Sequence, residues 1–147
     1  MDQRLINDVQ AAEGLRLRAY RDSKGFWTIG YGHYLLPQDR DWSSYSISSD
    51  DANIFLQSDL RDAYHDGLTL PEWGSLDTDC RQNSIIELVF NLGYHKWIPF
   101  KKTRACIQIQ DWPGAHDNLL DSDWATEVGT TRSNRLANYL LKGSYPS

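Results

Sequence analysis

The chain has 147 residues and a net charge of −5, with 15 Lys and Arg against 20 Asp and Glu. This length suits one domain that buries an apolar core without disulfides or metals, and the acidic balance disfavours nucleic acid as the main partner. The sequence has no HExxH, GxxxxGKS, GxxxxGKT or GxGxxG motif, which disfavours metalloproteases and the common nucleotide-binding folds. We therefore expect neither a metal nor a cofactor.

The first predicted element is an amphipathic helix that ends at the Glu13-Gly14 pair. Its apolar residues recur at helical spacing: Leu5, Ile6, Val9 and Ala12. A hairpin follows, because the polar run 21–25 has the composition of a β-turn and the alternation from Thr28 onward predicts a return strand. We interpret residues 34–49 as a loop, although residues 45–47 also fit a short strand.

The remainder of the chain predicts helices. Ser48 and Asp51 have capping-box spacing at the start of a helix that continues to Gly67. The next helix is apolar on most sides, which is typical of a central core helix. That helix is predicted to run from Leu76-Asp77 to Gly93, and another from Pro99 to Ile109. A further helix follows Asp111, and the last helix is capped by Thr130 or Thr131 and ends at Gly143.

These elements predict an α+β fold that is mainly helical and forms a single domain over residues 1–147. We expect a small β-hairpin lobe at about residues 13–49 and a linking helix at 50–67. Residues 1–12 and 68–147 would form the helical lobe.

Two features concern the cellular compartment. The sequence opens without a cationic leader followed by an apolar run, and no segment approaches the length of a membrane span. We therefore expect no signal peptide, folding in a cytoplasm and no stable membrane association. Cys80 and Cys106 lack the spacing of a CxxC or a Cys/His ligand set, so we expect buried thiols rather than a disulfide or a metal site.

Three residues around the hairpin have the chemistry of glycosidic bond cleavage, which needs a proton donor and a second carboxylate. Glu13 ends an amphipathic helix, where apolar neighbours favour its protonated form. Asp22 lies in a polar turn, where a carboxylate stays ionised. The hydroxyl of Thr28 could hold a water against Asp22. Taken singly, these residues also fit a helix end, a turn former and a strand residue.

The combination is more specific, because residues 13–33 read EGLRLRAYRDSKGFWTIGYGH. This segment resembles the catalytic segment of the phage-type lysozymes, the glycoside hydrolase family typified by the lysozyme of T-even bacteriophages. Residues 88–93 (LVFNLG) resemble a second marker of the family, and Trp124 with residues 131–135 (TRSNR) resembles a third. The fold expected from this resemblance is lysozyme-like.

The resemblance implies that Glu13 is the general acid, Asp22 the carboxylate that activates or replaces water, and Thr28 the water-holding partner. It implies hydrolysis of the β-1,4 bond between N-acetylmuramic acid and N-acetylglucosamine in bacterial peptidoglycan, with inversion at the anomeric carbon. The implied substrate-binding residues are Leu35, Phe90, Asn91 and Arg132, with Arg135 as an alternative alignment for Arg132.

The resemblance also implies a biological setting. It implies a monomeric phage endolysin that lyses the host cell, made in the host cytoplasm and released by a holin to act on the wall in the periplasm. Two other functions stay open: a non-catalytic wall-binding module of a tail or secretion device, and a lytic transglycosylase. An intact Glu13, Asp22 and Thr28 set disfavours both, because binding needs no proton donor and a transglycosylase uses a single catalytic Glu.

Two further expectations concern charged residues. Five aspartates and Arg61 give residues 50–66 a charge of −4, while most Lys residues lie in the second half of the chain. This distribution either steers an anionic substrate to a basic lobe or consists of ordinary solvated faces. We expect His33 to pair with Asp59 and to tie the hairpin to the linking helix rather than to take part in catalysis.

Overall fold

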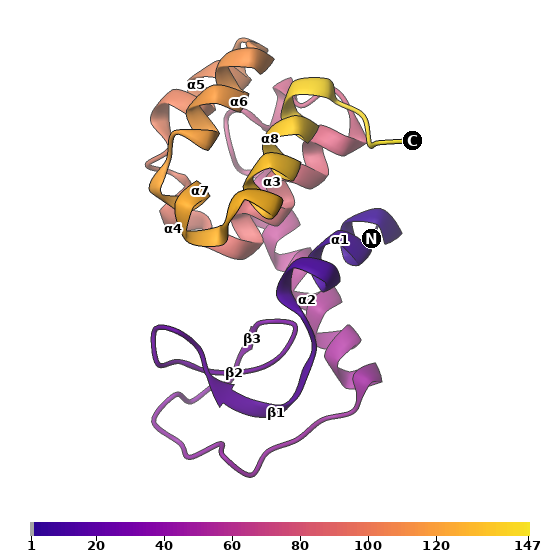
Figure 1. Cartoon of the computed structure of the whole chain (residues 1–147), viewed down its shortest axis with the longest axis vertical. Helices are drawn as coiled ribbons and strands as arrows, with labels where there is room; N and C mark the ends of the chain where they lie inside the picture. The colour runs from indigo at the N-terminus through magenta and orange to yellow at the C-terminus, as the bar shows by residue number, and fades with distance from the viewer. Residues whose placement is uncertain (1) are drawn as a thin grey trace. The chain divides into compact units, whose positions relative to one another are not determined.

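The computed structural model describes residues 2–147 and divides into two compact units, one ending at Asp62 and one running from Ala63 to Ser147 (Figure 1). Most of the chain is α-helical, and the first unit contains a three-stranded antiparallel sheet. This composition confirms the predicted α+β class. Among the described residues, no helix has the length and apolar character needed to cross a membrane.

The first unit begins with a helix whose buried face follows the predicted spacing. Its elements are α1 (Gln3–Glu13), β1 (Arg16–Arg21), β2 (Trp27–Gly30), β3 (His33–Tyr34) and the first part of α2 (Ser49–Leu68). In α1, Leu5, Ile6 and Val9 are buried, whereas Ala12 is exposed. The helix ends at Glu13, as predicted, because Gly14 leaves helical geometry with φ 73°.

The sheet has the order β1-β2-β3, with β2 in the centre. One face carries the core of this unit, made by Ala19, Trp27, Ile29 and Leu35, with Trp42, Ile47 and Phe55 packed against them. The short strand β3 was not predicted, since two residues are too few to show an alternation. Residues 45–47 remain mostly loop and contribute one bridge, between Ser46 and Arg18.

Helix α2 is attached to the rest of the first unit by polar contacts. The Ser48 hydroxyl accepts a hydrogen bond from the Asp51 amide at 3.1 Å, as the capping pattern predicts. His33 Nδ1 lies 2.8 Å from Asp59 Oδ2, which confirms the expected pair. The His33 ring also stacks on Phe55 with centroids 4.5 Å apart. The sheet is therefore held to α2 by both a polar and an aromatic contact.

The second unit consists of helices packed against one another (Figure 1). Its elements after α2 are η1 (Trp73–Ser75), α3 (Asp79–Leu92), α4 (Tyr94–Trp97), α5 (Lys101–Gln108), α6 (Trp112–Leu120), α7 (Asp123–Val128) and α8 (Thr130–Lys142). Helix α3 is buried along most of its length, which confirms its predicted central place. It starts at Asp79, after the N-cap Thr78, rather than at Leu76.

The helix ends agree with the predicted signals in most places. Asp111 caps α6 by accepting a hydrogen bond from the Gly114 amide at 3.0 Å, and Gly143 ends α8 with φ 69°. The predicted capping of α8 by Thr130 or Thr131 is wrong, because Gly129 is the N-cap and no side chain caps this end. The short elements η1, α4 and α7 were missed, since none has enough residues for a helical period.

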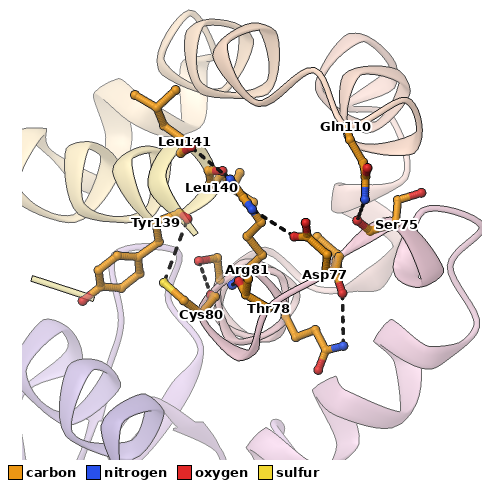
Figure 2. A network of polar contacts seen from close by, with 12 residues as sticks. Ser75, Asp77, Thr78, Cys80, Arg81, Gln110, Tyr139, Leu140 and Leu141 are labelled. Carbon is orange, nitrogen blue, oxygen red and sulfur yellow. Dashed lines mark hydrogen bonds and ion pairs between the residues drawn. The ribbon is translucent and has the colours of Figure 1, made fainter. Parts of the chain in front are cut away.

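Two polar networks connect the helices of the second unit. Buried Glu72 accepts hydrogen bonds from the indole of Trp97 at 3.0 Å and from Arg104 Nε at 2.7 Å. The Arg81 guanidinium donates to the carbonyls of Leu140 and Leu141 at the end of α8, at 2.8 and 3.0 Å (Figure 2). Both cysteines are thiols, Cys80 buried in α3 and Cys106 partly buried in α5, so the expectation of full burial holds for Cys80 only.

Candidate active site

Glu13 is the last residue of α1, and its carboxyl is half-buried. The turn between β2 and β3 passes close to it, because a Cβ placed on Gly32 would lie 3.2 Å from Glu13 Oε2. Gly32 also has φ 82°, a conformation that side chains disfavour. A glycine at this position therefore lets the backbone approach the carboxyl of Glu13.

Asp22 lies in the turn between β1 and β2, as predicted. Its Oδ1 accepts hydrogen bonds from the amides of Lys24 and Phe26, both at 2.9 Å. The Asp22 amide donates to the Phe26 carbonyl at 2.9 Å. A carboxylate held by two backbone donors has a fixed orientation, because the turn itself sets the direction of both amides.

Thr28 lies in the central strand and is only 2% exposed. Its hydroxyl donates to the Phe26 carbonyl at 2.8 Å. The hydroxyl proton is therefore committed within the sheet, and only the oxygen lone pairs can interact with a further group. Thr28 can accept a hydrogen bond from a water but does not donate to it in this geometry.

The strand register places two tyrosines beside Thr28. Thr28 is directly opposite Tyr20 on β1 and Tyr34 on β3, so the three side chains share a face. Burial raises the pKa of Tyr20; the cation of Arg16 lowers it, and the carboxylates of Glu13 and Asp22 raise it further. Burial is also the main cause that raises the pKa of Tyr34. The negative charge of Asp22 raises this pKa further, and that of Glu13 does so more weakly. Both phenols thus lie within electrostatic range of both acids.

Leu35, a predicted substrate-binding residue, belongs to the core of the first unit. Its side chain is 5% exposed and packs with Ala19, Trp27 and Ile29. Its backbone amide is bonded to the Trp27 carbonyl at 3.0 Å. Little of Leu35 is accessible to a ligand, so its position favours a packing role.

Phe90 and Asn91 lie near the end of α3 in the second unit, and both are partly buried. Asn91 Oδ1 accepts a hydrogen bond from the Trp124 indole at 2.7 Å. The second and third sequence markers of the resemblance therefore meet in one contact, which fixes the orientation of the Asn91 amide.

Arg132 and its alternative Arg135 are both held by a single carboxylate. Arg132 Nε donates to Glu87 Oε2 at 3.0 Å, and Arg135 donates to both Glu87 oxygens at 2.9 and 2.7 Å. Glu87 is buried in α3, where the low dielectric strengthens such charge-assisted bonds. Glu87 was not predicted from the sequence, although a glutamate within an apolar helix is itself a signal of a buried partner.

The second unit also has a groove of about 570 Å³ that the sequence did not predict. Apolar and aromatic side chains from α3, α7 and the loop before α5 line it, with lysines of α4 and α5 and acidic residues among the lining groups. The lining residues are Leu92, Lys96, Pro99, Phe100, Lys101, Lys102, Thr103, Asn118, Asp121, Ser122, Asp123, Trp124 and Glu127. They come from six separate stretches of the chain, so no local pattern could have identified them. Within residues 2–147, no cluster of His, Cys, Asp and Glu side chains is arranged to hold a metal ion.

Comparison with known proteins agrees with the fold. Residues 10–138 match the model of the phage lysozyme family, and the chain belongs to this family. The relatives are distant. Probable T4-type lysozyme 1 of Dictyostelium discoideum is 25% identical over 155 residues, which cover 90% of each chain. Probable T4-type lysozyme 2 of the same organism is 26% identical over 156 residues, again covering 90% of each.

A third relative has a different context. The pre-baseplate central spike protein of Enterobacteria phage T4 is 26% identical over 157 residues, covering 92% of this chain. The chain spans only 27% of the length of that spike protein. Similarity to this chain thus occurs both in proteins of this size and within a much longer phage protein.

Proposed function

We propose that the protein is a muramidase that hydrolyses the β-1,4 bond between N-acetylmuramic acid and N-acetylglucosamine in peptidoglycan. The observation that supports this proposal is that Glu13 and Asp22 both act electrostatically on Tyr20 and Tyr34, the two residues paired with Thr28 in the sheet. Membership of the phage lysozyme family supports the same activity class and substrate polymer.

The chemistry follows from the roles that these groups can take. Glu13 protonates the glycosidic oxygen, so that the leaving sugar departs as a neutral alcohol. A water is held by two acceptors: Asp22 takes one of its hydrogens and the lone pair of Thr28 takes the other. The water oxygen then has a lone pair directed at the anomeric carbon. As the bond forms, its proton passes to Asp22.

The water takes this orientation because the Thr28 hydroxyl donates its proton to the Phe26 carbonyl and can only accept from the water. A hydroxyl that donated to the water would occupy one of its two lone pairs and make the water oxygen less nucleophilic. Attack by water on the face opposite the leaving group inverts the anomeric carbon. We propose inversion on this basis and by analogy with the family.

The groove of the second unit is proposed as a further surface for the same substrate. Peptidoglycan carries short peptides with both carboxylate and ammonium groups, and the groove offers lysines and acidic residues around an aromatic floor. Asn91 is bonded to Trp124, one of the lining residues. We propose that Phe90, Asn91 and Arg132 contact the polymer from this unit, and that Leu35 contributes by shaping the sheet.

Two other functions remain alternatives. The relationship to a pre-baseplate spike protein favours a module of a phage tail, either catalytic or purely binding. A lytic transglycosylase would use Glu13 alone and leave anhydro ends. The fixed orientation of Asp22 and the buried hydroxyl of Thr28 favour hydrolysis, because neither feature is needed for binding or for internal cyclisation of the sugar.

We propose a role in host cell lysis as a monomeric endolysin. In this proposal the protein is made in the host cytoplasm and reaches the periplasmic wall through a holin. Family membership supports this setting, in which the enzyme meets peptidoglycan only when lysis begins.

The test is product analysis by mass spectrometry after digestion of purified peptidoglycan. Hydrolysis yields reducing muramic acid ends, a transglycosylase yields anhydro ends, and a binding module yields neither. Glu13→Gln should lower turnover by about 10²–10⁴-fold, since the amide cannot donate the required proton. Its thermal unfolding should match the wild type.

Asp50→Asn is the control, because Asp50 is an exposed acid in the first turn of α2 in the same unit. It should retain wild-type turnover. Near wild-type activity of Glu13→Gln, or anhydro ends as the main product, would contradict the proposed mechanism.

A further inference from the structure

Tyr34 lies next to the proposed acids, although sequence reasoning gave it no role. It is 51% exposed, so packing does not explain an aromatic residue here. It is paired with Thr28 across β2 and β3, and directly opposed residues have Cβ atoms about 4.5–5.5 Å apart on one face of the sheet. The strand register therefore sets Tyr34 beside the proposed water-holding hydroxyl.

Phe26 links Tyr34 to Asp22 by a second route. The Phe26 amide donates to Asp22 Oδ1 at 2.9 Å, and its ring contacts the Tyr34 ring with centroids 5.6 Å apart. This contact holds the Tyr34 ring near the turn that carries Asp22, within reach of a hydrogen bond from the phenol hydroxyl to the carboxylate.

The remaining hydrogen-bonding capacity of Asp22 matches this donor. Both backbone amides, from Lys24 and Phe26, donate to Oδ1, which leaves Oδ2 as the oxygen that can meet a hydroxyl or a water. A carboxylate that has to take a proton from water must direct one oxygen at it. A donor placed at the side of the carboxylate restrains its rotation. The carboxylate can still accept a proton from water, because an ionised carboxylate has about four acceptor sites.

We propose that Tyr34 is a positioning residue for Asp22, with its hydroxyl donating to the carboxylate and holding it toward the water that Thr28 also holds. The effect of Tyr34 on catalysis rests on the proposed function. The hydrogen bond from Tyr34 to Asp22 does not depend on that function. The charged groups that face the phenol are Asp22, Lys24 and Glu13, all from the first unit.

The kinetic test compares Tyr34→Phe with the wild type on soluble peptidoglycan fragments. The substitution keeps the ring and its contact with Phe26 and removes only the hydroxyl. We expect kcat to fall about three- to ten-fold, the range for loss of one hydrogen bond, with KM within about two-fold and an unchanged unfolding temperature. Tyr45→Phe is the matched control, since Tyr45 is a 37% exposed tyrosine of the same unit whose ring packs on Trp42.

An unchanged kcat in Tyr34→Phe, or a loss confined to KM, would overturn the inference, because the hydroxyl would then be either inert or a sugar contact. Equal losses in Tyr34→Phe and Tyr45→Phe would also overturn it. Restoration of wild-type kcat is not expected from any apolar residue at position 34.

A second measurement is independent of activity. In protein with ¹³C-labelled tyrosine rings, the resonance missing from Tyr34→Phe identifies Tyr34, and its titration reports the phenol. Asp22→Asn should move that titration to lower pH, since the variant removes the carboxylate charge that raises the pKa of Tyr34. No movement would refute the contact. A shifted titration in a protein that cuts no peptidoglycan would instead contradict the proposed function and leave the contact standing.

Discussion

Single residues in the first unit carry the proposed chemistry, and the sequence identified three of them. Glu13, Asp22 and Thr28 were found because each lies at a recognisable place in a local pattern: a helix end, a turn and a strand. Gly32 and Tyr34 were not found, since their relevance comes from what they approach. Gly32 is next to the Glu13 carboxyl, and Tyr34 is next to Asp22 only because β3 pairs with β2.

At this scale the role of Thr28 is testable with two substitutions. Thr28→Ser keeps an oxygen that can accept from water and should retain most of the activity. Thr28→Val keeps the shape but loses the oxygen, so the water is no longer held on that side and kcat should fall by about 10²-fold. Product formation under saturating substrate checks this, with circular dichroism to verify folding. Equal activity of the two variants would show that the hydroxyl holds no reactive water.

Secondary-structure elements were predictable where capping residues mark their ends. Ser48 and Asp111 cap α2 and α6 as expected, and Gly143 ends α8. The α8 end is also stabilised by a residue from another helix, because Arg81 of α3 donates to the carbonyls of Leu140 and Leu141 (Figure 2). These carbonyls belong to the last turn, whose acceptors have no partner within the helix. No local pattern around residue 81 indicates this contact.

Gly143→Ala should destabilise the protein by about 2 kcal/mol or more. Gly143 has φ 69°, which costs about 1–2 kcal/mol for a residue with a side chain, and a Cβ there would lie 2.5 Å from Arg81 Nη1. Gly74→Ala is the control, since a Cβ at Gly74 meets nothing within 4 Å and its φ is not positive. Urea denaturation gives the free energy of unfolding of each variant.

A double-mutant cycle separates the two causes. Arg81→Met removes the guanidinium, so Gly143→Ala should cost less in that background and only the backbone term should remain. An identical cost in both backgrounds would mean that Arg81 does not restrict position 143.

At the scale of the whole molecule, the charge distribution favours ordinary solvated faces over a basic lobe, the two interpretations that the sequence left open. The unit from Ala63 to Ser147 has ten acidic and eight basic residues, a net charge of −2, so it is not a basic lobe. Arg104, Arg132 and Arg135 bind the buried acids Glu72 and Glu87. Three of the four lysines of this unit, Lys96, Lys101 and Lys102, line the groove, so any electrostatic steering by lysines is strongest at that surface.

We propose that the chain unfolds as the single domain that the sequence suggests, although it has two compact units. Helix α2 runs from Ser49 to Leu68 and so continues through the boundary after Asp62. Melting of either unit would remove packing from the shared helix. Calorimetry should therefore give one transition with a van 't Hoff enthalpy equal to the calorimetric enthalpy. Two resolved transitions would contradict a single cooperative domain.

The sequence by itself determined the local structures and the residues with acid and base chemistry, because helix caps, turn composition and strand alternation act over a few neighbouring positions. Tertiary structure decided which distant side chains meet. The pairing of Glu87 with two arginines of α8, the groove in the second unit and the approach of Tyr34 to Asp22 depend on contacts between separate elements. Such contacts form only when packing brings those elements together, so no spacing along the chain encodes them directly.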